Sequence, residues 1–198
     1  MKEKSEPIIS FHDADIINGE NTVVYGLNMD VSGGQTVYIL GKVGTGKTSI
    51  IRTITAENRL GGGEGMVCGF NLGTLKQKDI PFLRRKIGVV FQDFRLLKDR
   101  NVYENVAFAM EIIHQPKKLI RKYVPQVLSM VGIASKADKY PDELSAGEQQ
   151  RVAIARAIVN KPRILIADEP TGNLDPDTAW EIMQLLDQIN MRGTTIVM

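Results

Sequence analysis

Cysteine and histidine are scarce in this sequence. Cys68 is the one cysteine among 198 residues, and His12 and His114 are the two histidines. A single cysteine excludes an intramolecular disulfide and a cysteine-based zinc site, and it is compatible with a reducing cytosol. An isolated histidine is more often packed or solvated than catalytic, so we assign neither histidine a role.

Long apolar runs and a strong excess of one charge are also missing. No stretch approaches the ~20 apolar residues that span a bilayer, and the charged start, residues 1–7, lacks the apolar core of a secretory signal. We therefore expect a cytoplasmic protein that reaches a membrane only through a partner. The net charge of +2 provides no argument for nucleic-acid binding. A length of 198 residues, of which 43% are hydrophobic, suits one large globular domain.

A glycine-rich segment is the strongest feature that is present. Residues 41–48 have the sequence GKVGTGKT, which fits the phosphate-loop pattern. Its glycines let the backbone turn its N–H groups toward phosphate oxygens. Lys47 supplies a cation for the β- and γ-phosphates, and the Thr48 hydroxyl can ligate Mg²⁺. The residues expected to bind nucleotide here are Gly41, Lys42, Val43, Gly44, Thr45, Gly46, Lys47, Thr48 and Ser49.

The flanking residues provide the context that this motif requires. Residues 36–40 (TVYIL) predict a buried strand, and residues 49–54 continue as a helix whose positive N-terminal end would add to the anion site. A strand, a glycine loop and a helix in this order are typical of a phosphate-binding loop. The alternative is a glycine-rich turn that has a lysine beside it, and it leaves the fit of both flanks unexplained.

Two acidic residues follow a second apolar run. Residues 164–169 have the sequence ILIADE, which predicts a buried parallel strand that ends in Asp168 and Glu169. Open α/β sheets bind their ligands at the carboxyl ends of such strands. Asp168 is placed to hold Mg²⁺ through its water shell, and Glu169 is placed to orient the attacking water or accept its proton. The alternative is an exposed acidic turn.

Residues 144–150, with the sequence LSAGEQQ, allow two interpretations. Ser145 followed three residues later by Glu148 is a helix capping box, so the segment can simply start the helix that runs to residue 160. The same helix start, with a serine hydroxyl and the N–H of Gly147, is also an anion site. It cannot serve the phosphate loop of its own chain if that loop already wraps the nucleotide. It would instead serve the nucleotide of a second copy.

The order of the elements predicts an α/β protein with a helical insert. Residues 8–14 and 23–31 predict two N-terminal strands, a flexible glycine-rich connection at 61–65 precedes a short strand at 66–68, and residues 87–91 predict a buried strand that leads to Gln92. Helical spacing replaces the strand patterns between residues 101 and 137, with Asn101 and Glu104 as a capping box and Gly132 as a stop. We expect a single domain with an α/β core at residues 1–92 and 146–198 and a helical subdomain at residues 93–145.

These motifs, in this order, resemble those of ATP-binding-cassette ATPases, and the resemblance covers essentially the whole chain. It implies a P-loop NTPase fold with a mostly parallel core sheet, an N-terminal antiparallel part and a helical subdomain. It also implies a head-to-tail homodimer with ATP and Mg²⁺ at its interface. The metal would be arranged by Thr48, Gln92 and Asp168, and Glu169 and Gln92 would be catalytic. The partner's nucleotide would be contacted by Ser145, Ala146, Gly147, Glu148 and, in a loop that crosses the interface, Asp175.

Three features depart from the family pattern. The aromatic residue that usually stacks on adenine is absent from residues 15–18 (DIIN). Ala146 replaces the first glycine of the common LSGGQ sequence, and because its N–H remains we expect a modest effect. The family's switch histidine follows the strand at residues 194–198, where this sequence ends. We therefore expect that the chain is truncated, and that it binds ATP but hydrolyses it weakly.

Residues 91–97 (FQDFRLL) and 99–107 resemble the cell-division branch of the family. This resemblance implies an integral membrane protein as the partner and a role in septal cell-wall hydrolysis. Phe94, Leu96 and Leu97 either line a groove that receives the partner or belong to the core of the helical insert. Two further alternatives remain: the ATPase of a lipoprotein-release or macrolide-efflux complex, and an ATP-gated scaffold that hydrolyses little ATP.

Overall fold

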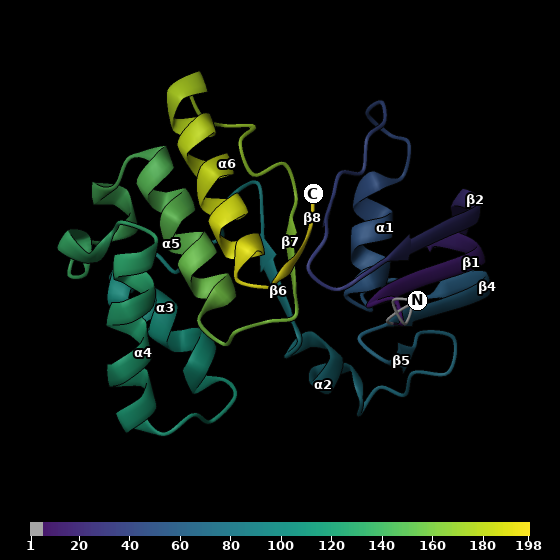
Figure 1. The fold of residues 1–198 in the computed structure, drawn as a ribbon, viewed down its shortest axis with the longest axis horizontal. Coiled ribbons are helices and arrows are strands. Elements are labelled where there is room, and N and C mark those ends of the chain that lie inside the picture. Colours follow the sequence, from purple (N-terminus) through teal and green to yellow (C-terminus); the bar gives the residue numbers. More distant parts are fainter. Residues whose placement is uncertain (1–5) are drawn as a thin grey trace, which may run out of the picture.

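Two four-stranded sheets organise the computed structural model, which describes residues 6–198 (Figure 1). One sheet is antiparallel with the strand order β2–β1–β4–β5, and the other is parallel with the order β3–β8–β7–β6. The strands are β1 (Ile9–Asn18), β2 (Asn21–Val31), β3 (Thr36–Val37), β4 (Leu60–Val67), β5 (Phe70–Asn71), β6 (Ile87–Val90), β7 (Ile164–Ala167) and β8 (Thr195–Val197). The helices are α1 (Lys47–Ile54), α2 (Ile80–Arg84), α3 (Val102–Glu111), α4 (Lys117–Met130), α5 (Ala146–Ile158) and α6 (Pro176–Met191), with 3₁₀ turns η1 (Ala134–Lys136) and η2 (Pro141–Glu143).

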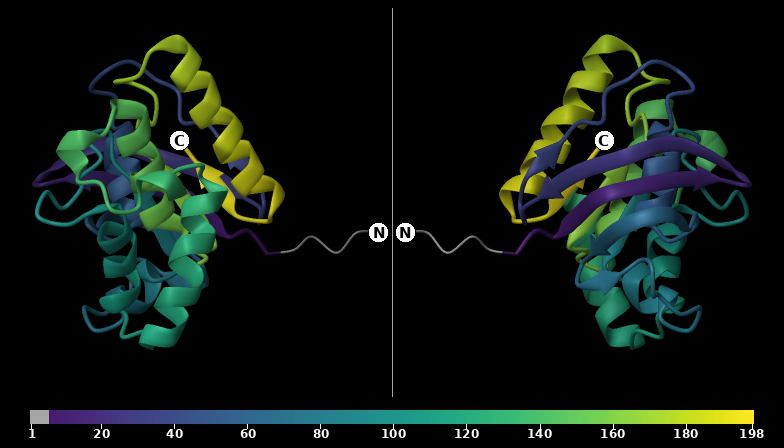
Figure 2. Two further views of the ribbon diagram at one scale, coloured as in Figure 1. Left: turned by 90° about the vertical axis from the view of Figure 1, so that its left-hand side faces the viewer. Right: turned by 90° about the vertical axis from the view of Figure 1, so that its right-hand side faces the viewer.

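The parallel sheet is covered on both faces. Helix α1 lies between the two sheets, whereas α5 and α6 cover the other face of the parallel sheet, with α3 and α4 beyond α5 (Figure 1). The antiparallel sheet forms one side of the molecule (Figure 2, right). Strand β7 is apolar throughout because both of its faces are covered. Ile164 and Ile166 pack with α1 and the antiparallel sheet, and Leu165 and Ala167 pack with the helices. The predicted α/β arrangement is confirmed.

Strand β4 corrects the expectation of a flexible glycine connection. Its eight residues, LGGGEGMV, pair with β1 in antiparallel register, so the glycines lie within a strand. Gly63 has a positive φ of 70°, and a Cβ there would lie 2.0 Å from the backbone oxygen of Asp13 on β1. Only glycine permits such a close approach of the two strands. Composition alone suggested flexibility because it does not show the neighbouring strand.

Strand β3 is shorter and more exposed than the sequence predicts. Its pairing with β8 covers Thr36 and Val37, and the hydrogen bonds between the two segments extend from Ile196 N to Gln35 O (2.9 Å) at one end and from Ile39 N to Met198 O (2.6 Å) at the other. The side chains of Tyr38 and Leu40 are 53% and 88% exposed. Since β3 is the edge strand of the parallel sheet, only one side of it is covered by another strand.

The helical region begins and ends where its capping signals predict. The Asn101–Glu104 capping box starts α3. After α4, the N–H of Gly132 donates to Ser129 O (3.1 Å) and the N–H of Ile133 donates to Leu128 O (2.9 Å), which is a Schellman ending. The buried side chains of α3 and α4 share one hydrophobic cluster with α5 and α6. Within residues 6–198 no helix is long and apolar enough to cross a membrane.

Candidate nucleotide-binding site

The lysine of the phosphate loop forms hydrogen bonds to carbonyls of the same loop. Lys47 begins α1, and its Nζ donates hydrogen bonds to the backbone carbonyls of Gly41 (2.7 Å) and Lys42 (2.9 Å). The Thr45 hydroxyl donates to the same Lys42 carbonyl (2.8 Å). At the tip of the loop Val43 is 99% exposed. The cation is therefore held inside the loop, at the positive end of α1, where an anion would compete for it.

The remaining predicted loop residues differ in accessibility. Gly44 and Gly46 have positive φ angles, and Gly46 is the N-cap of α1. Ser49 is buried in the first turn of α1, and its carbonyl accepts a hydrogen bond from the Thr53 hydroxyl (2.9 Å). The loop and helix start thus form as the sequence predicts, with Ser49 inside the fold.

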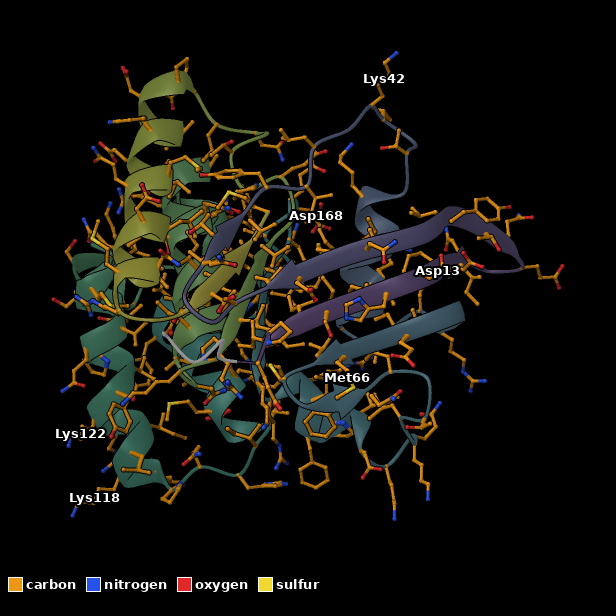
Figure 3. All side chains as sticks on the ribbon, turned by 45° about the vertical axis from the view of Figure 1, so that its right-hand side comes forward. Asp13, Lys42, Met66, Lys118, Lys122 and Asp168 are labelled. Carbon is orange, nitrogen blue, oxygen red and sulfur yellow. The ribbon has the colours of Figure 1, made fainter. Side chains whose placement is uncertain are left out.

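A cavity of about 70 Å³ brings Thr48 and Asp168 together. Asp168 follows β7, and its N–H donates to Val90 O of β6 (3.0 Å), so the parallel pairing extends to the carboxylate. Arg52, one turn along α1, and Arg95 line the same cavity. Figure 3 shows Lys42 projecting from the phosphate loop and Asp168 near the centre of the molecule. Hydroxyl and carboxylate oxygens are ligands that Mg²⁺ prefers.

The surroundings of Asp168 favour a cation beside it. Burial raises the pKa of the Asp168 carboxyl, the Glu169 carboxylate raises it further, and Arg52 and Lys47 oppose the rise. Burial and a like charge both disfavour the ionised carboxylate, and a divalent cation would relieve both effects. The residues present at this site therefore fit Mg²⁺.

Glu169 and Gln92 lie beside Gly172 rather than in the Thr48–Asp168 cavity. Gln92 Nε2 and Glu169 Oε2 lie 3.3 Å and 3.7 Å from the position that a Cβ on Gly172 would occupy. The Asn173 side-chain amide donates to the Gln92 carbonyl (3.1 Å). Among the described residues, then, two of the three predicted metal ligands share the cavity, and Gln92 faces the loop of Glu169.

The start of α5 is a complete capping box. The N–H of Glu148 donates to the Ser145 hydroxyl (3.3 Å), and the N–H of Ser145 donates to the Glu148 carboxylate (2.9 Å). This second bond lowers the pKa of Glu148, as does Lys136, whose Nζ lies 3.4 Å from the carboxylate. Ser145 and Ala146 are exposed, whereas Gly147 is buried. The structural interpretation of this segment is confirmed, and its exposed hydroxyl stays available to an outside anion.

The starts of α5 and α6 lie in contact. A Cβ on Gly147 would lie 2.4 Å from Cγ2 of Thr178, so only glycine allows this approach. Asp175 is the N-cap of α6, and its carboxylate accepts a hydrogen bond from the N–H of Thr178 (3.1 Å). The Thr178 hydroxyl lowers the pKa of Asp175, and the N–H of Thr178 lowers it further. The predicted residues of the second nucleotide contact therefore form one connected surface.

The two predicted nucleotide contacts belong to helices on different sides of the parallel sheet. Helix α1 lies between the sheets and the phosphate loop projects beyond the strands from its start, whereas α5 lies beyond the opposite face of the parallel sheet (Figure 1). The helix that carries Ser145 and the helix that follows the phosphate loop therefore lie on opposite faces of the parallel sheet. This separation agrees with an α5 that serves the nucleotide of another copy.

Two side chains of α5 that the sequence reasoning missed reach the loops of the site. Gln150 Nε2 donates to Pro170 O (2.7 Å), next to Glu169. Arg156 donates to the carbonyls of Phe94 (2.7 Å) and Arg95 (2.6 Å), shortly after Gln92. Burial lowers the pKa of Arg156. A charged residue inside the apolar run VAIARAI is an available sequence signal, because such a residue is buried only with a partner.

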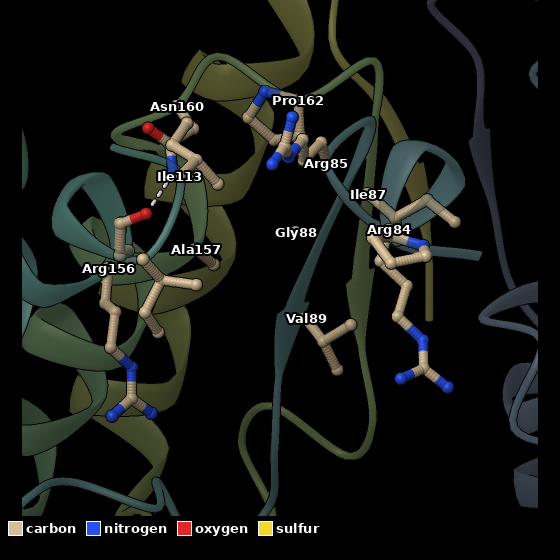
Figure 4. Close-up of a pocket in the computed structure, with 13 residues that line it drawn as sticks. Arg84, Arg85, Ile87, Gly88, Val89, Ile113, Arg156, Ala157, Asn160 and Pro162 are labelled. Atoms are coloured by element: carbon tan, nitrogen blue, oxygen red, sulfur yellow. Dashed lines mark hydrogen bonds between the residues drawn. The ribbon is translucent and has the colours of Figure 1, made fainter. Parts of the chain in front are cut away.

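A groove of about 490 Å³ lies between β6 with the end of α2 and the helices α3 and α5 (Figure 4). Ile112 and Ile113, which follow α3, contribute apolar surface, and Arg84, Arg85 and Arg156 contribute positive charge. Ile112 is 58% exposed. The groove therefore offers both apolar and cationic contacts to a ligand or a partner.

Phe94, Leu96 and Leu97 do not line this groove. Phe94 and Leu96 pack against the hydrophobic cluster of the helices, and Leu97 is half-buried. The N–H of Leu97 donates to the side chain of buried Asn105 (2.8 Å). For Phe94 and Leu96 the core interpretation is therefore the one that the packing supports.

Comparison with known families identifies the class of protein. A family model described as "ABC transporter" matches residues 24–172. The chain therefore belongs to the ATP-binding-cassette family, and it is an ATPase that binds ATP.

The expected P-loop NTPase fold is confirmed by solved cassettes. One of them, "cbiO1" from Clostridium perfringens, is 33% identical with a TM-score of 0.89 and covers 98% of this chain and 78% of that chain. A dimeric cassette, "MJ0796", bound to ADP and Pi, is 32% identical with a TM-score of 0.83 and covers 96% and 86%.

Similar curated proteins carry a more particular name. The chain is 53% identical over 177 residues to the "Cell division ATP-binding protein FtsE" of Streptococcus pneumoniae, which covers 89% of this chain and 77% of that protein. The protein of the same name from Bacillus subtilis is 53% identical over 87% of this chain and 76% of its own length. The one from Escherichia coli is 41% identical over 91% and 81%.

Proposed function

We propose that this chain is the ATP-hydrolysing subunit of a membrane-associated complex that acts in cell division. The observation that carries the proposal is the 53% identity to cell-division relatives over 89% of the chain. The cavity shared by Thr48 and Asp168, with Glu169 next in the chain, supports the chemistry. In this role the partner is an FtsX-like integral membrane protein, and the complex promotes septal cell-wall hydrolysis.

Each of the following residues would have its own role at the nucleotide. Lys47 exchanges its bonds to the loop carbonyls for phosphate oxygens, and Thr48 and Asp168 hold Mg²⁺. The metal supplies charge neutralisation at the β- and γ-phosphates when it is bound. Glu169 orients the attacking water and accepts its proton, and Gln92 reaches the same water from the side of Gly172.

The complete site would require two copies. Because α1 and α5 lie on opposite faces of the parallel sheet, we infer that Ser145, Gly147 and Glu148, at the start of α5, close over the γ-phosphate of a partner copy. Asp175 would contribute from the same surface, through the loop that starts α6. The dimeric relative bound to ADP and Pi supports this arrangement.

The membrane partner would engage the groove shown in Figure 4. Its apolar floor and its three arginines suit a short amphipathic segment that carries acidic side chains. Arg156 lines the groove and also holds the carbonyls that follow Gln92. A partner in the groove would thus be coupled to the nucleotide site and would hold the protein at the cytoplasmic face of the membrane. The alternatives are a lipoprotein-release or macrolide-efflux complex and a scaffold that assembles on ATP without cycling.

Capture of the partner tests this proposal. Full-length protein with Glu169→Gln would be isolated from detergent-solubilised membranes with and without ATP, and its companions identified by mass spectrometry. We expect ATP-dependent dimers and enrichment of an FtsX-like protein. An efflux or lipoprotein-release permease in its place would contradict the cell-division role. Normal division in cells that carry Glu169→Gln would support the scaffold.

Groove variants sharpen the capture experiment. Ile112→Asp places a charge on the groove and should abolish capture while ATP binding stays normal. Met191→Asp is the matched control, because Met191 is 84% exposed and lies outside the residues that line the groove. Equal capture by the two variants would exclude this groove as the docking site.

A further inference from the structure

Gln150 is a buried polar side chain that bonds to the loop after Glu169. Its exposure is 0%, and it lies on α5, five residues after Ser145. Its Nε2 donates to Pro170 O at 2.7 Å, in a bond that spans 20 residues of the chain. The orientation of the amide is fixed by chemistry, because a carbonyl oxygen only accepts and the nitrogen must therefore face Pro170.

Pro170 follows the proposed catalytic carboxylate directly. Glu169 has a φ of 48°, in the left-handed region that non-glycine residues rarely adopt. The turn that contains both residues is closed by a hydrogen bond from the N–H of Gly172 to Glu169 O (3.1 Å). Such a backbone persists only where its surroundings hold it. The bond from Gln150 is a contact that holds this turn from outside its own segment.

The other end of the Gln150 amide argues against a purely stabilising role. Its Oε1 is buried and has no hydrogen-bond partner among residues 6–198. A buried acceptor without a partner destabilises a fold, whereas an apolar side chain of the same shape would not. If this residue served only stability, an apolar side chain would serve better, because it has no acceptor that needs a partner. What the amide adds is a donor aimed at one carbonyl.

We propose that Gln150 is a positioning residue. It lies on the helix that contacts the partner's nucleotide, and from there it holds Glu169 in the orientation that hydrolysis of ATP requires. The proposal rests on the dimeric function proposed above. Helix α5 begins at Ser145, which faces the other copy's γ-phosphate, and it holds Pro170 one and a half turns later. Engagement of one nucleotide by the start of α5 is thereby transmitted to the carboxylate that serves the other nucleotide. The two sites of the dimer are coupled through a single rigid helix.

The test is Gln150→Met in the full-length protein. Methionine keeps the unbranched shape and removes the donor. We expect kcat to fall by roughly 10- to 100-fold, the range for a misplaced catalytic group. The Kd for ATP should change by less than about twofold, because ground-state binding is untouched. The melting temperature should change little, because the substitution removes the unpaired Gln150 Oε1 but leaves Pro170 O without its donor. The amides of Gly172 and Leu174 should exchange hydrogen faster without nucleotide. ATP-dependent dimers of Glu169→Gln should still form when Gln150→Met is added.

The matched control is Asn190→Leu. The Asn190 amide also donates to backbone carbonyls, those of Gly34 and Thr194 (both 2.9 Å), but it lies at the end of α6 away from Glu169. This variant should lower the melting temperature and leave kcat per folded molecule unchanged. Unchanged kcat for Gln150→Met, or unchanged exchange at Gly172, would overturn the proposal. If the unsubstituted protein failed to hydrolyse ATP, the proposed function would fall, while the exchange measurement would still decide whether Gln150 holds the turn.

Discussion

The contact between Gly147 and Thr178 gives a prediction whose magnitude follows from the geometry. A Cβ on Gly147 would lie 2.4 Å from Cγ2 of Thr178, far inside van der Waals contact. Forcing a methyl into such a site destabilises a protein by about 1–3 kcal/mol. Alanine also gains about 1 kcal/mol over glycine within a helix. Gly147→Ala should therefore lower the free energy of unfolding by about 0–2 kcal/mol in total.

A second substitution separates these two effects. Thr178→Ser removes the clashing methyl and little else, because the Cβ and Oγ1 of Thr178 lie 3.8 Å and 3.9 Å from the added Cβ. In the Thr178→Ser background, Gly147→Ala should stabilise the protein by about 1 kcal/mol, since only the helix propensity remains. The coupling energy between the two positions should then be about 1–3 kcal/mol.

Urea unfolding of the four proteins without nucleotide measures this coupling. The free energy of unfolding of the unsubstituted protein, the two single variants and the double variant gives the coupling energy directly. ATP-dependent dimerisation is a second assay: Gly147→Ala should weaken it, because the starts of α5 and α6 are pushed apart, and the double variant should recover it. Effects on stability that add within about 0.5 kcal/mol would refute the close contact of the two helices.

Three further predictions concern single side chains. Arg156→Met removes two hydrogen bonds from a charged donor and should lower the free energy of unfolding by about 2–4 kcal/mol, measured in urea; no loss would mean that this guanidinium does not hold the Gln92 loop. Burial raises the pKa of the Cys68 thiol. The stability that the buried neutral thiol contributes is therefore complete below the pKa of the unfolded thiol and is lost as the pH rises through the higher folded pKa. Between about pH 8 and pH 10 the free energy of unfolding should thus fall more steeply for the unsubstituted protein than for Cys68→Ala, and equal slopes would contradict the shift. Asp175→Ala removes the N-cap of α6 and should destabilise the protein by about 1 kcal/mol, whereas Asp175→Asn keeps a capping oxygen and should cost less; equal losses would argue against the cap.

Features that depend on neighbouring residues in the chain could be predicted from the sequence. The capping boxes at Asn101 and Ser145 and the apolar strand before Asp168 are local patterns, and each forms where it is expected. Strand β4 could not be predicted, because its glycines are explained by a strand about 50 residues earlier in the chain. The exposure of Leu40 likewise depends on β3 lying at the sheet edge.

The geometry of the site depends still more on distant contacts. The phosphate loop and the acidic pair were recognisable from residue types, and the structure places Thr48 and Asp168 in one cavity. The position of Gln92 beside Gly172 was not predictable, since 80 residues separate them. Nor was the role of Gln150, because its bond to Pro170 requires both segments to be folded. A polar residue in an apolar helix was visible in the sequence, but its partner was not.

Helix α5 connects the separate loops of the site, and this has a mechanical consequence. Ser145 is at its start, Gln150 holds the loop after Glu169, and Arg156 holds the carbonyls after Gln92. Between them Arg151 donates to Val131 O (2.8 Å), at the end of α4, and pairs with a carboxylate of α6 (2.7 Å). A rigid shift of α5 therefore cannot occur without moving both catalytic loops or breaking these bonds. If dimer closure moves the start of α5 toward a nucleotide, the loops of Glu169 and Gln92 must respond together, because the same helix holds both.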